Sequence, residues 1–212
     1  MHGKTCIVTG ATSGIGKETA VALAAGGAHV AIVCRTRDRG ERALAEIRER
    51  AGSRAVSLFV ADLASRAAVR EVAGALVAAL PRIDVLVNNA GLTLRERVVT
   101  AEGLETTFAV NHLAYFLLAR LLGPRLAASA PSRIVNVASD AHRMGTLRFD
   151  DLMGARRYDG WRAYAQSKLA NIVFTYELAR RLAGTGVTAN CLHPGVVSTN
   201  FGQNQPSWLK WS

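Results

Sequence analysis

A tyrosine and a lysine four residues apart, Tyr164 and Lys168, are the first residues whose types and spacing suggest chemistry. In a helix, residues at this spacing share one face. A free tyrosine has a pKa of about 10, and a cation within about 4–6 Å favours the phenolate and lowers that value. Such a pair can act as a general acid or base at ordinary pH. Taken alone, the same spacing is more typical of an ordinary helix surface, so other motifs must support the interpretation.

A glycine-rich turn near the N-terminus indicates a second kind of chemistry, the binding of a pyrophosphate. Gly10, Gly14 and Gly16 follow a short apolar strand and precede a helix. Glycine lets the backbone bend sharply and approach a ligand closely, and a helix N-terminus offers free N–H groups with a partial positive charge. Because the turn opens a strand–turn–helix unit, we expect it to bind a dinucleotide.

The end of the second predicted strand indicates which dinucleotide. A NAD site usually places an acidic residue there, to bind the ribose 2′-hydroxyl. In this sequence Arg35 follows Cys34 instead, and a guanidinium suits a 2′-phosphate. We therefore expect NADP(H) as cofactor, with NAD(H) less favoured. Arg37 and Arg39 either assist Arg35 or merely coat the start of a helix.

The segments that must position these residues alternate between strand and helix. That alternation predicts parallel strands, buried on both faces and joined by right-handed crossovers. We expect one α/β domain over residues 1–212, with a doubly wound parallel sheet of six strands. The strands are predicted at Lys4–Thr9, Ala28–Cys34, Ala55–Val60, Ile83–Val87, Arg133–Ala138 and Val187–Leu192. The helices are predicted at Lys17–Ala25, Asp38–Ala51, Ser65–Leu80, Leu104–Leu122 (halted by Gly123-Pro124) and Ala163–Leu182.

Composition excludes several other classes of protein. Half of the 212 residues are hydrophobic and 20% are charged, unlike a disordered chain. The 26 Lys and Arg residues outnumber 16 Asp and Glu, but the arginines are scattered and form no basic stripe, so nucleic acid is not an expected partner. Neither a signal peptide nor an apolar run of about 18 residues occurs, so we expect no membrane span. Three distant cysteines inside apolar runs predict a reduced, cytoplasmic location.

Four motifs in chain order resemble the short-chain dehydrogenase/reductase family. They are T-G-x-x-x-G-x-G at Thr9–Gly16, N-N-A-G at Asn88–Gly91, Y-x-x-x-K at Tyr164–Lys168 and P-G at Pro194–Gly195. The resemblance covers nearly the whole chain and implies a single-domain Rossmann-type fold. The strings around Phe108–Leu113 and Ala163–Ile172 look most like the retinol dehydrogenase-like branch.

The resemblance also implies a catalytic tetrad of Asn111, Ser139, Tyr164 and Lys168. Hydride then passes between the nicotinamide C4 and the carbonyl carbon, and Tyr164 transfers the proton. Ser139 positions the substrate oxygen, Lys168 also binds the nicotinamide ribose, and Asn111 holds a water near the lysine. No metal is implied. The expected cofactor contacts are Gly10, Thr12, Ser13, Gly14, Ile15, Gly16, Arg35, Asp62, Leu63, Asn89, Ala90, Gly91, Tyr164, Lys168, Pro194, Gly195 and Thr199.

The function implied is that of an NADP(H)-dependent oxidoreductase that interconverts an alcohol and a ketone or aldehyde, with a small or lipophilic substrate that the branch itself does not identify. Family members often dimerise through the two long helices, although a buried core face gives the same apolar pattern. His112 and His193 are interpreted as structural. Tyr158 and Trp161, just before the last helix, either line a substrate cleft or have a structural role.

One departure from the family supports an alternative function. Family members usually continue after the P-G element with a substrate-covering helix and a seventh strand, whereas this sequence stops at Ser212. The sixth strand would then be an exposed edge. Apolar residues near the end would replace the missing segment or contact a partner; they are Trp208, Leu209 and Trp211. The alternative is therefore a catalytically impaired NADP-binding module that acts as a sensor or partner protein.

Overall fold

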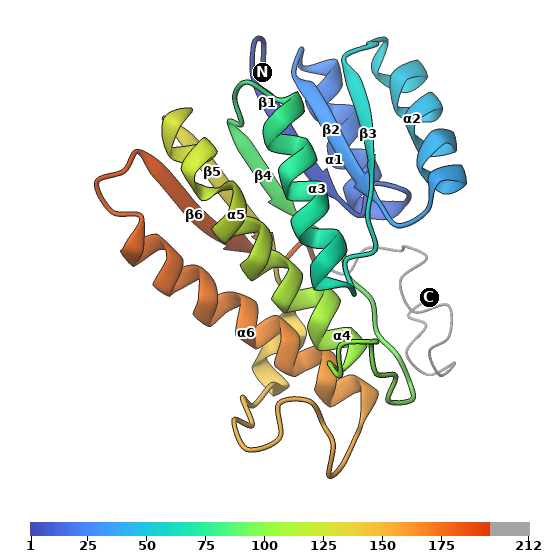
Figure 1. Ribbon diagram of the computed structural model, residues 1–212, viewed down its shortest axis with the longest axis vertical. Coiled ribbons are helices and arrows are strands. Elements are labelled where there is room, and N and C mark those ends of the chain that lie inside the picture. Colours follow the sequence, from blue (N-terminus) through green and yellow to red (C-terminus); the bar gives the residue numbers. More distant parts are fainter. Residues whose placement is uncertain (196–212) are drawn as a thin grey trace.

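The computed structural model describes residues 1–195 and contains a six-stranded parallel sheet in the order β3-β2-β1-β4-β5-β6 (Figure 1). The strands are β1 (Thr5–Thr9), β2 (His29–Cys34), β3 (Val56–Val60), β4 (Val85–Asn88), β5 (Ser132–Val137) and β6 (Val187–Leu192). The helices are α1 (Gly14–Ala25), α2 (Arg37–Ala51), α3 (Arg66–Ala79), α4 (Thr106–Phe108), α5 (Ala114–Ala128) and α6 (Gly160–Arg181). Two short helices complete the set: the π-helix η1 (Ala109–Leu113) and the 3₁₀-helix η2 (Asp140–Met144). The predicted doubly wound α/β fold is confirmed.

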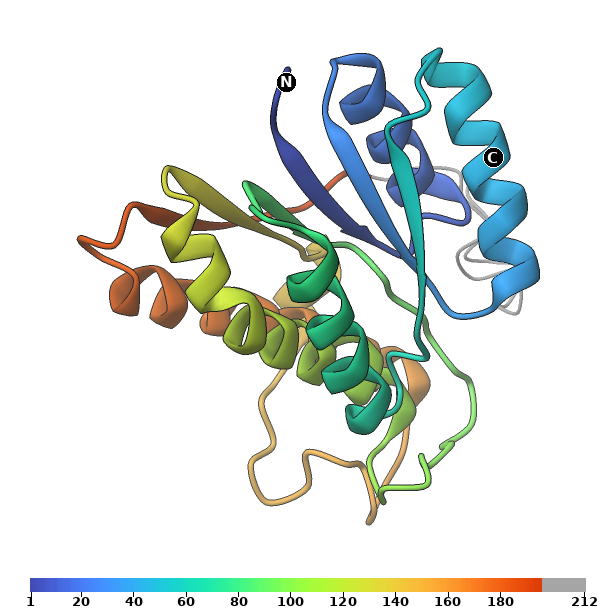
Figure 2. The same ribbon diagram turned by 45° about the horizontal axis from the view of Figure 1, so that its top comes forward.

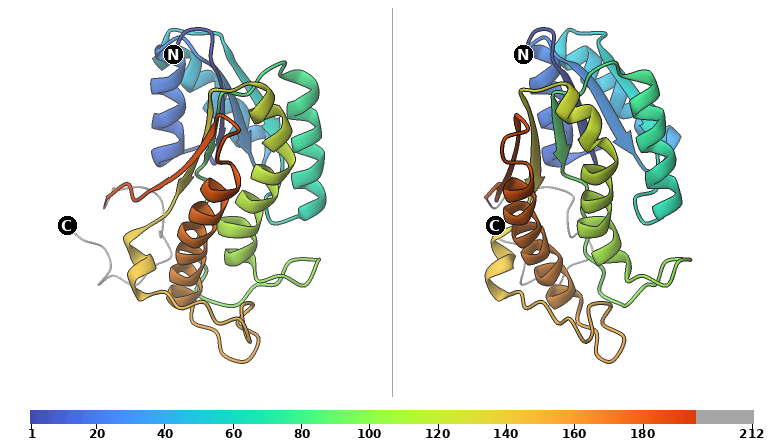
Figure 3. Two further views of the ribbon diagram at one scale, coloured as in Figure 1. Left: turned by 90° about the vertical axis from the view of Figure 1, so that its left-hand side faces the viewer. Right: turned by 60° about the vertical axis from the view of Figure 1, so that its left-hand side comes forward.

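Helices cover both faces of the sheet, which lies between two helical layers (Figure 3). Successive side chains of a strand point to opposite faces, so each buried strand contributes to two cores. In β1, Ile7 packs toward α3, α5 and α6, whereas Cys6 and Val8 pack toward α1 and α2. This burial on both faces explains why the strands read as continuous apolar runs.

The strand order reverses between β1 and β4, which places a crevice at the carboxyl ends of these two strands. The glycine-rich turn follows β1, and the N-N-A-G segment follows β4. Two long loops, 89–105 and 145–159, extend beyond the same end of the sheet, together with the first turns of α6 (Figures 1 and 2). The fold therefore brings all four motifs to one edge.

The prediction of one regular helix over Leu104–Leu122 is wrong, because the helix is interrupted and because it ends later. The segment is divided into α4, η1 and α5, and α5 continues to Ala128 with Pro124 inside it. Proline lacks a backbone donor and normally breaks a helix. Here Pro124 is exposed, while Leu122 and Leu126 on either side are fully buried in the core. Packing of that apolar face outweighs the local preference.

The two ends of the sheet are covered differently within residues 1–195. There β6 pairs with β5 alone, so it is the edge strand of the described sheet. Helices α1 and α2 pack against the β1–β3 side, and no helix of residues 1–195 covers β5 and β6 on that face. Arg133, Thr188 and Asn190 are accordingly exposed there. Trp208, Leu209 and Trp211 lie outside the described residues.

Candidate functional site

The glycine-rich turn is shaped by close backbone contacts that only glycine permits. Gly10 and Gly14 have positive φ angles of 70° and 55°. A Cβ built on Gly10 would lie 2.7 Å from the Cα of Ala90, and one built on Gly16 would lie 2.5 Å from the carbonyl oxygen of Gly10. The predicted reason for these glycines, a tight turn with close backbone approach, is therefore present in the geometry.

Thr9 joins this turn to the N-N-A-G segment. Its Oγ1 accepts hydrogen bonds from the backbone N–H groups of Asn89 at 2.9 Å and Ala90 at 3.0 Å. In return, Asn89 Nδ2 donates to the carbonyl of Thr9 at 2.8 Å. Thr9 was not among the expected site residues, although it is the first residue of the glycine motif. It has a positioning role, because it fixes the two loops that flank the crevice.

The start of α1 suits an anionic ligand. Ser13 is the N-cap but makes no side-chain cap hydrogen bond, and the first turn holds no acidic residue. The first N–H groups of the helix and its positive dipole end are thus available to a phosphate. These free N–H groups and the positive end of the helix dipole fit a pyrophosphate. The residues present therefore fit the predicted dinucleotide.

The residues expected to bind the adenosine half lie at the ends of β2 and β3. Arg35 follows β2 directly, is exposed and forms no ion pair with other residues of 1–195. Arg37 is paired with Glu41 at 3.5 Å. Asp62 is exposed and its Oδ1 accepts from Ala64 N at 3.0 Å, which turns the loop, while Leu63 packs into the core. An arginine that lacks a carboxylate partner remains available to an external anion.

The helix α6 and the segment after β5 bring three of the four tetrad residues together. Tyr164 and Lys168 lie one turn apart on α6 and are both buried. Lys168 Nζ is 5.7 Å from the centre of the Tyr164 ring and donates to the carbonyl of Val137 at 2.8 Å. Ser139, the N-cap of η2, shares a side-chain hydrogen bond with Tyr164. The hydroxyl groups of Ser139 and Tyr164 therefore meet above the end of β5.

Burial governs the protonation of this group. It lowers the pKa of the Lys168 ammonium to about 8, because the charged form loses its hydration. It raises the pKa of Tyr164 above its ordinary value, and the hydrogen bond with Ser139 only partly opposes that change. The expected lowering of the tyrosine pKa is thus wrong for this structure, since burial outweighs the one opposing cause, the hydrogen bond with Ser139. Tyr164 is a neutral phenol at pH 7, and hence a proton donor.

Asn111 lies in η1 and joins three segments. Its Nδ2 donates to the carbonyl of Leu92 at 2.9 Å and to Ser167 Oγ at 3.0 Å, and its Oδ1 accepts from Leu92 N at 2.9 Å. A Cβ built on Gly91 would lie 3.5 Å from Asn111 Oδ1 and 3.6 Å from Lys168 Nζ. Asn111 therefore flanks the same glycine as Lys168, and its amide holds the N-N-A-G loop in place.

A cavity of about 630 Å³ lies between the loop 145–159 and the first turns of α6. It is lined by Ala163 and Gln166, which lie on the opposite face of α6 from Tyr164 and Lys168. Trp161 packs against the Tyr164 ring at 5.6 Å, whereas Tyr158 lines the cavity. Sequence reasoning did not find this cavity, because the loop that forms it has no periodic pattern.

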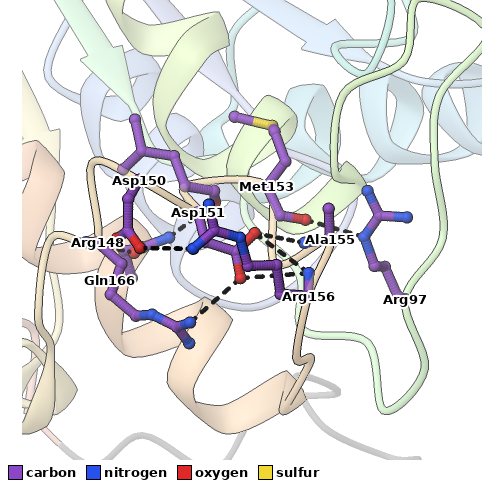
Figure 4. Close-up of polar contacts among 9 residues, drawn as sticks. Arg97, Arg148, Asp150, Asp151, Met153, Ala155, Arg156 and Gln166 are labelled. Carbon is purple, nitrogen blue, oxygen red and sulfur yellow. Dashed lines mark hydrogen bonds and ion pairs between the residues drawn. The ribbon is translucent and has the colours of Figure 1, made fainter.

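Asp151 folds the loop that bounds this cavity (Figure 4). Its buried carboxylate accepts from Ala155 N at 2.7 Å and forms an ion pair with Arg148 at 3.2 Å. Gln166 reaches into the loop from α6, donating to the carbonyl of Leu152 at 2.9 Å and accepting from Arg148 N at 3.1 Å. These contacts fix the loop to the helix that also carries Tyr164.

The remaining expected contacts lie after β6. Pro194 and Gly195 follow this strand, and Gly195 has a φ of 81°. Thr199 lies outside the described residues. Among residues 1–195, no cluster of His, Cys, Asp and Glu side chains is suited to a metal ion, and no helix is both long and apolar enough to cross a bilayer.

Comparison with known proteins identifies the family. The sequence profile of short chain dehydrogenases matches residues 4–210. The chain belongs to this family. Human retinol dehydrogenase 13 (Homo sapiens) is 47% identical over 203 residues, which make up 95% of this chain and 61% of that protein. Mouse retinol dehydrogenase 12 (Mus musculus) is 48% identical over 202 residues, 95% of this chain and 64% of the relative. The chain thus spans about three-fifths of the length of these curated relatives.

Solved structures agree with the short-chain dehydrogenase assignment. A protein of Mycobacterium Paratuberculosis is 38% identical to this chain and has a TM-score of 0.82. The structural alignment covers 94% of this chain and 70% of that protein. The L-sorbose reductase of Gluconobacter frateurii, solved with NADPH and L-sorbose, is 28% identical and has a TM-score of 0.78. That alignment covers 94% of this chain and 72% of the reductase chain. The predicted resemblance to a short-chain dehydrogenase, retinol dehydrogenase-like, is confirmed.

Proposed function

We propose that the chain is an NADP(H)-dependent oxidoreductase that interconverts an alcohol and a ketone or aldehyde. The observation that carries this proposal is the convergence of Ser139, Tyr164 and Lys168 at the crevice beside the glycine-rich turn. The names of the curated relatives, which are retinol dehydrogenases, support the same reaction class.

The side chains have separate parts in the proposed reaction. In reduction, Tyr164 donates its phenolic proton to the carbonyl oxygen, and in oxidation it takes that proton back. Ser139 binds the same oxygen, since its hydroxyl already meets that of Tyr164. Lys168, with a pKa of about 8, is mostly cationic at pH 7 and stabilises the phenolate that is left after proton transfer. When bound, the nicotinamide cofactor supplies or accepts the hydride.

The preference for NADP(H) rests on Arg35. The residue after β2 is a cation where a NAD site carries an acid, and it has no carboxylate partner among residues 1–195. A guanidinium can bind a 2′-phosphate through two parallel hydrogen bonds. The solved L-sorbose reductase holds NADPH, which agrees with a 2′-phosphate site in this family.

The proposed substrate is small and lipophilic. Met144, at the end of the short helix that Ser139 caps, and Phe149, on the loop that follows it, are exposed to 62% and 80%. Exposed apolar side chains on the segment that follows Ser139 would favour an apolar ligand. We further propose a homodimer through the exposed apolar residues of α5 and α6, such as Phe116 and Tyr176.

Because all three cysteines are free thiols in the structure, we propose a cytoplasmic location.

The first experiment measures the melting temperature of the purified chain without ligand, with NADPH and with NADH. A ligand at 100 times its Kd adds about 2.7 kcal/mol of stability, which corresponds to roughly 5–10 °C for a domain of this size. We expect such a rise with NADPH and little change with NADH. A panel of aliphatic ketones and aldehydes with NADPH then tests turnover. NADPH binding without turnover of any carbonyl would instead support the impaired module that acts as a sensor or partner protein.

A further inference from the structure

We propose that Asn171 is a positioning residue that holds η1, and with it Asn111, in register with Lys168. Asn171 is fully buried on α6, and its Nδ2 donates to the main-chain carbonyl of Asn111 at 2.8 Å. Its Oδ1 lies 3.0 Å from His112 Nδ1. One amide side chain therefore binds two successive residues of the π-helix. The proposal rests on the proposed reductase function.

The turn that carries Asn111 has unusual geometry. Ala114 N donates to the carbonyl of Ala109, five residues back, so the helix is widened at this turn. Only three residues of regular helix, Thr106–Phe108, precede it. A π turn breaks the regular helical hydrogen-bond pattern, so contacts from outside the helix must help to hold its position. Asn171 supplies such a contact at the middle of the turn.

The pair formed with His112 fixes the orientation of the Asn171 amide. Because Nδ2 donates to Asn111, the amide oxygen faces the imidazole, and Nδ1 of His112 is the donor. The imidazole is itself packed between the rings of Phe108 at 5.1 Å and Phe174 at 5.9 Å. His112 therefore cannot turn away without loss of packing, and Asn171 is held from both sides.

The connection to the reacting centre runs through α6. Asn171 lies one turn after Lys168 on this helix, so the helix that carries Lys168 also anchors the main chain of Asn111. From there the Asn111 side chain holds Leu92 beside the N-N-A-G loop. If the Asn171 amide is lost, we expect η1 to move relative to α6, which changes the distance between Asn111 and Lys168.

Thr175 offers a matched control on the same buried face of α6. Its Oγ1 donates to the main-chain carbonyl of Asn171 at 2.6 Å and accepts from Asn136 Nδ2 at 2.9 Å. It has no hydrogen bond to η1 among the described residues. The variant Thr175→Val also removes two buried hydrogen bonds at similar volume, but leaves the Asn171 amide on Asn111 and His112. If Asn171 only stabilised the fold, its variants and Thr175→Val would have the same effects on exchange in residues 109–113 and on kcat.

The test compares Asn171→Ala, Asn171→Asp and Thr175→Val in the full chain. Hydrogen–deuterium exchange of the cofactor-free protein is read at residues 109–113, and kcat and the KM for NADPH are measured with the best carbonyl of the panel. For both Asn171 variants we expect exchange in 109–113 to be about tenfold faster and kcat to be about tenfold lower, the effect of one buried hydrogen bond. The KM for NADPH should change less than kcat, because the Asn111 side chain keeps its own hydrogen bonds to Leu92 beside the N-N-A-G loop.

For Thr175→Val we expect a lower melting temperature, with exchange in 109–113 and kcat close to those of the wild type. Unchanged exchange in 109–113 for the Asn171 variants, or a kcat within about twofold of wild type, would overturn the proposal. If Asn171→Ala does not fold, Asn171→Asp carries the test, because it keeps the side-chain volume and replaces the amide donor with an oxygen of an ionisable carboxyl group. If the wild type reduces no carbonyl, the proposed function fails, and the exchange result alone decides about Asn171.

Discussion

The glycine-rich turn and the reacting centre are built in opposite ways. The turn is shaped by the absence of side chains, so that backbone atoms of Gly10, Gly16 and Ala90 come within a few ångströms. The reacting centre is shaped by buried polar side chains, with Asn111, Ser167, Lys168 and Asn171 almost fully enclosed. One region offers free N–H groups to an anion, whereas the other has removed its polar groups from water.

This difference determines how each region fails. In the turn, a Cβ added at Gly10 or Gly16 would lie 2.7 Å or 2.5 Å from a neighbouring backbone atom, so the loop would have to move. In the reacting centre, a removed atom leaves a buried donor or acceptor without its partner. Added side-chain atoms in the turn should therefore weaken cofactor binding and leave the reacting groups intact. Removed side-chain atoms in the reacting centre should lower the rate and leave the cofactor bound. The predictions below test this division.

The largest expected effect is that of Tyr164→Phe, which removes one oxygen atom from the centre. Loss of a general acid typically lowers the rate by about 10²–10⁴-fold, so we expect kcat to fall in that range while NADPH still raises the melting temperature. Tyr158→Phe is the matched control, because Tyr158 lines the cavity on the other face of α6. Turnover of Tyr164→Phe at the wild-type rate would show that the proton donor is another group.

The second prediction adds one carbon to the turn. In Gly16→Ala the new Cβ would lie 2.5 Å from the carbonyl oxygen of Gly10, so the loop must move. We expect the Kd for NADPH to rise by about 10–100-fold, which corresponds to 1.4–2.8 kcal/mol. In Gly74→Ala, on α3, the Cβ meets nothing within 4 Å, and this control should bind NADPH normally. Equal binding by both variants would show that the turn does not hold the cofactor.

The same division explains how much the sequence could predict. Glycine spacing together with the strand before it and the helix after it located the turn, because the requirement for glycine is local. The alternation of strand and helix was enough for the doubly wound sheet, since right-handed crossovers leave few topologies. Local rules failed for Pro124, where core packing of Leu122 and Leu126 outweighs them. They also failed for the pKa of Tyr164, which depends on burial that no local pattern shows.

Contacts between distant segments were beyond local rules as well. Thr9 accepts from the backbone 80 residues away, and Asn171 donates to Asn111 at a separation of 60. A lone threonine or asparagine in an apolar run gives no sign of such a partner. Only the polar residue type inside a buried stretch could have drawn attention to Asn171, because a buried amide must find hydrogen bonds.

The third prediction concerns cofactor choice. Arg35→Ala removes a cation that has no carboxylate partner in residues 1–195. Hydrogen bonds to charged groups are worth about 1.5–3 kcal/mol, so we expect the Kd for NADPH to rise roughly tenfold or more, with little change for NADH. Arg37→Ala, measured beside it, tests whether the neighbouring arginine assists. Arg70→Ala on α3 is the control for the loss of one exposed positive charge. Equal losses for NADPH and NADH would contradict the role of Arg35.

The smallest expected effect is on stability, and it arises at Lys168. The folded-state pKa of about 8 lies below the value of 10.5 for a free lysine, so burial of this ammonium opposes folding. Below about pH 8 both the folded and unfolded states carry the proton, and the penalty is complete. Between about pH 8 and 10.5 the unfolded state binds more protons, so the free energy of unfolding rises with pH as the penalty is relieved.

Lys168→Met should therefore stabilise the cofactor-free protein at neutral pH while abolishing turnover. Loss of the hydrogen bond to Val137 offsets part of the gain, and we expect a net increase of about 1 kcal/mol at pH 7. That advantage over the wild type should shrink as the pH approaches about 10. Urea unfolding of both proteins at the two pH values measures it. If the difference in free energy of unfolding between the variant and the wild type is the same at both pH values, Lys168 is hydrated in the folded state. The reacting centre would then not be the enclosed region that is contrasted here with the glycine-rich turn.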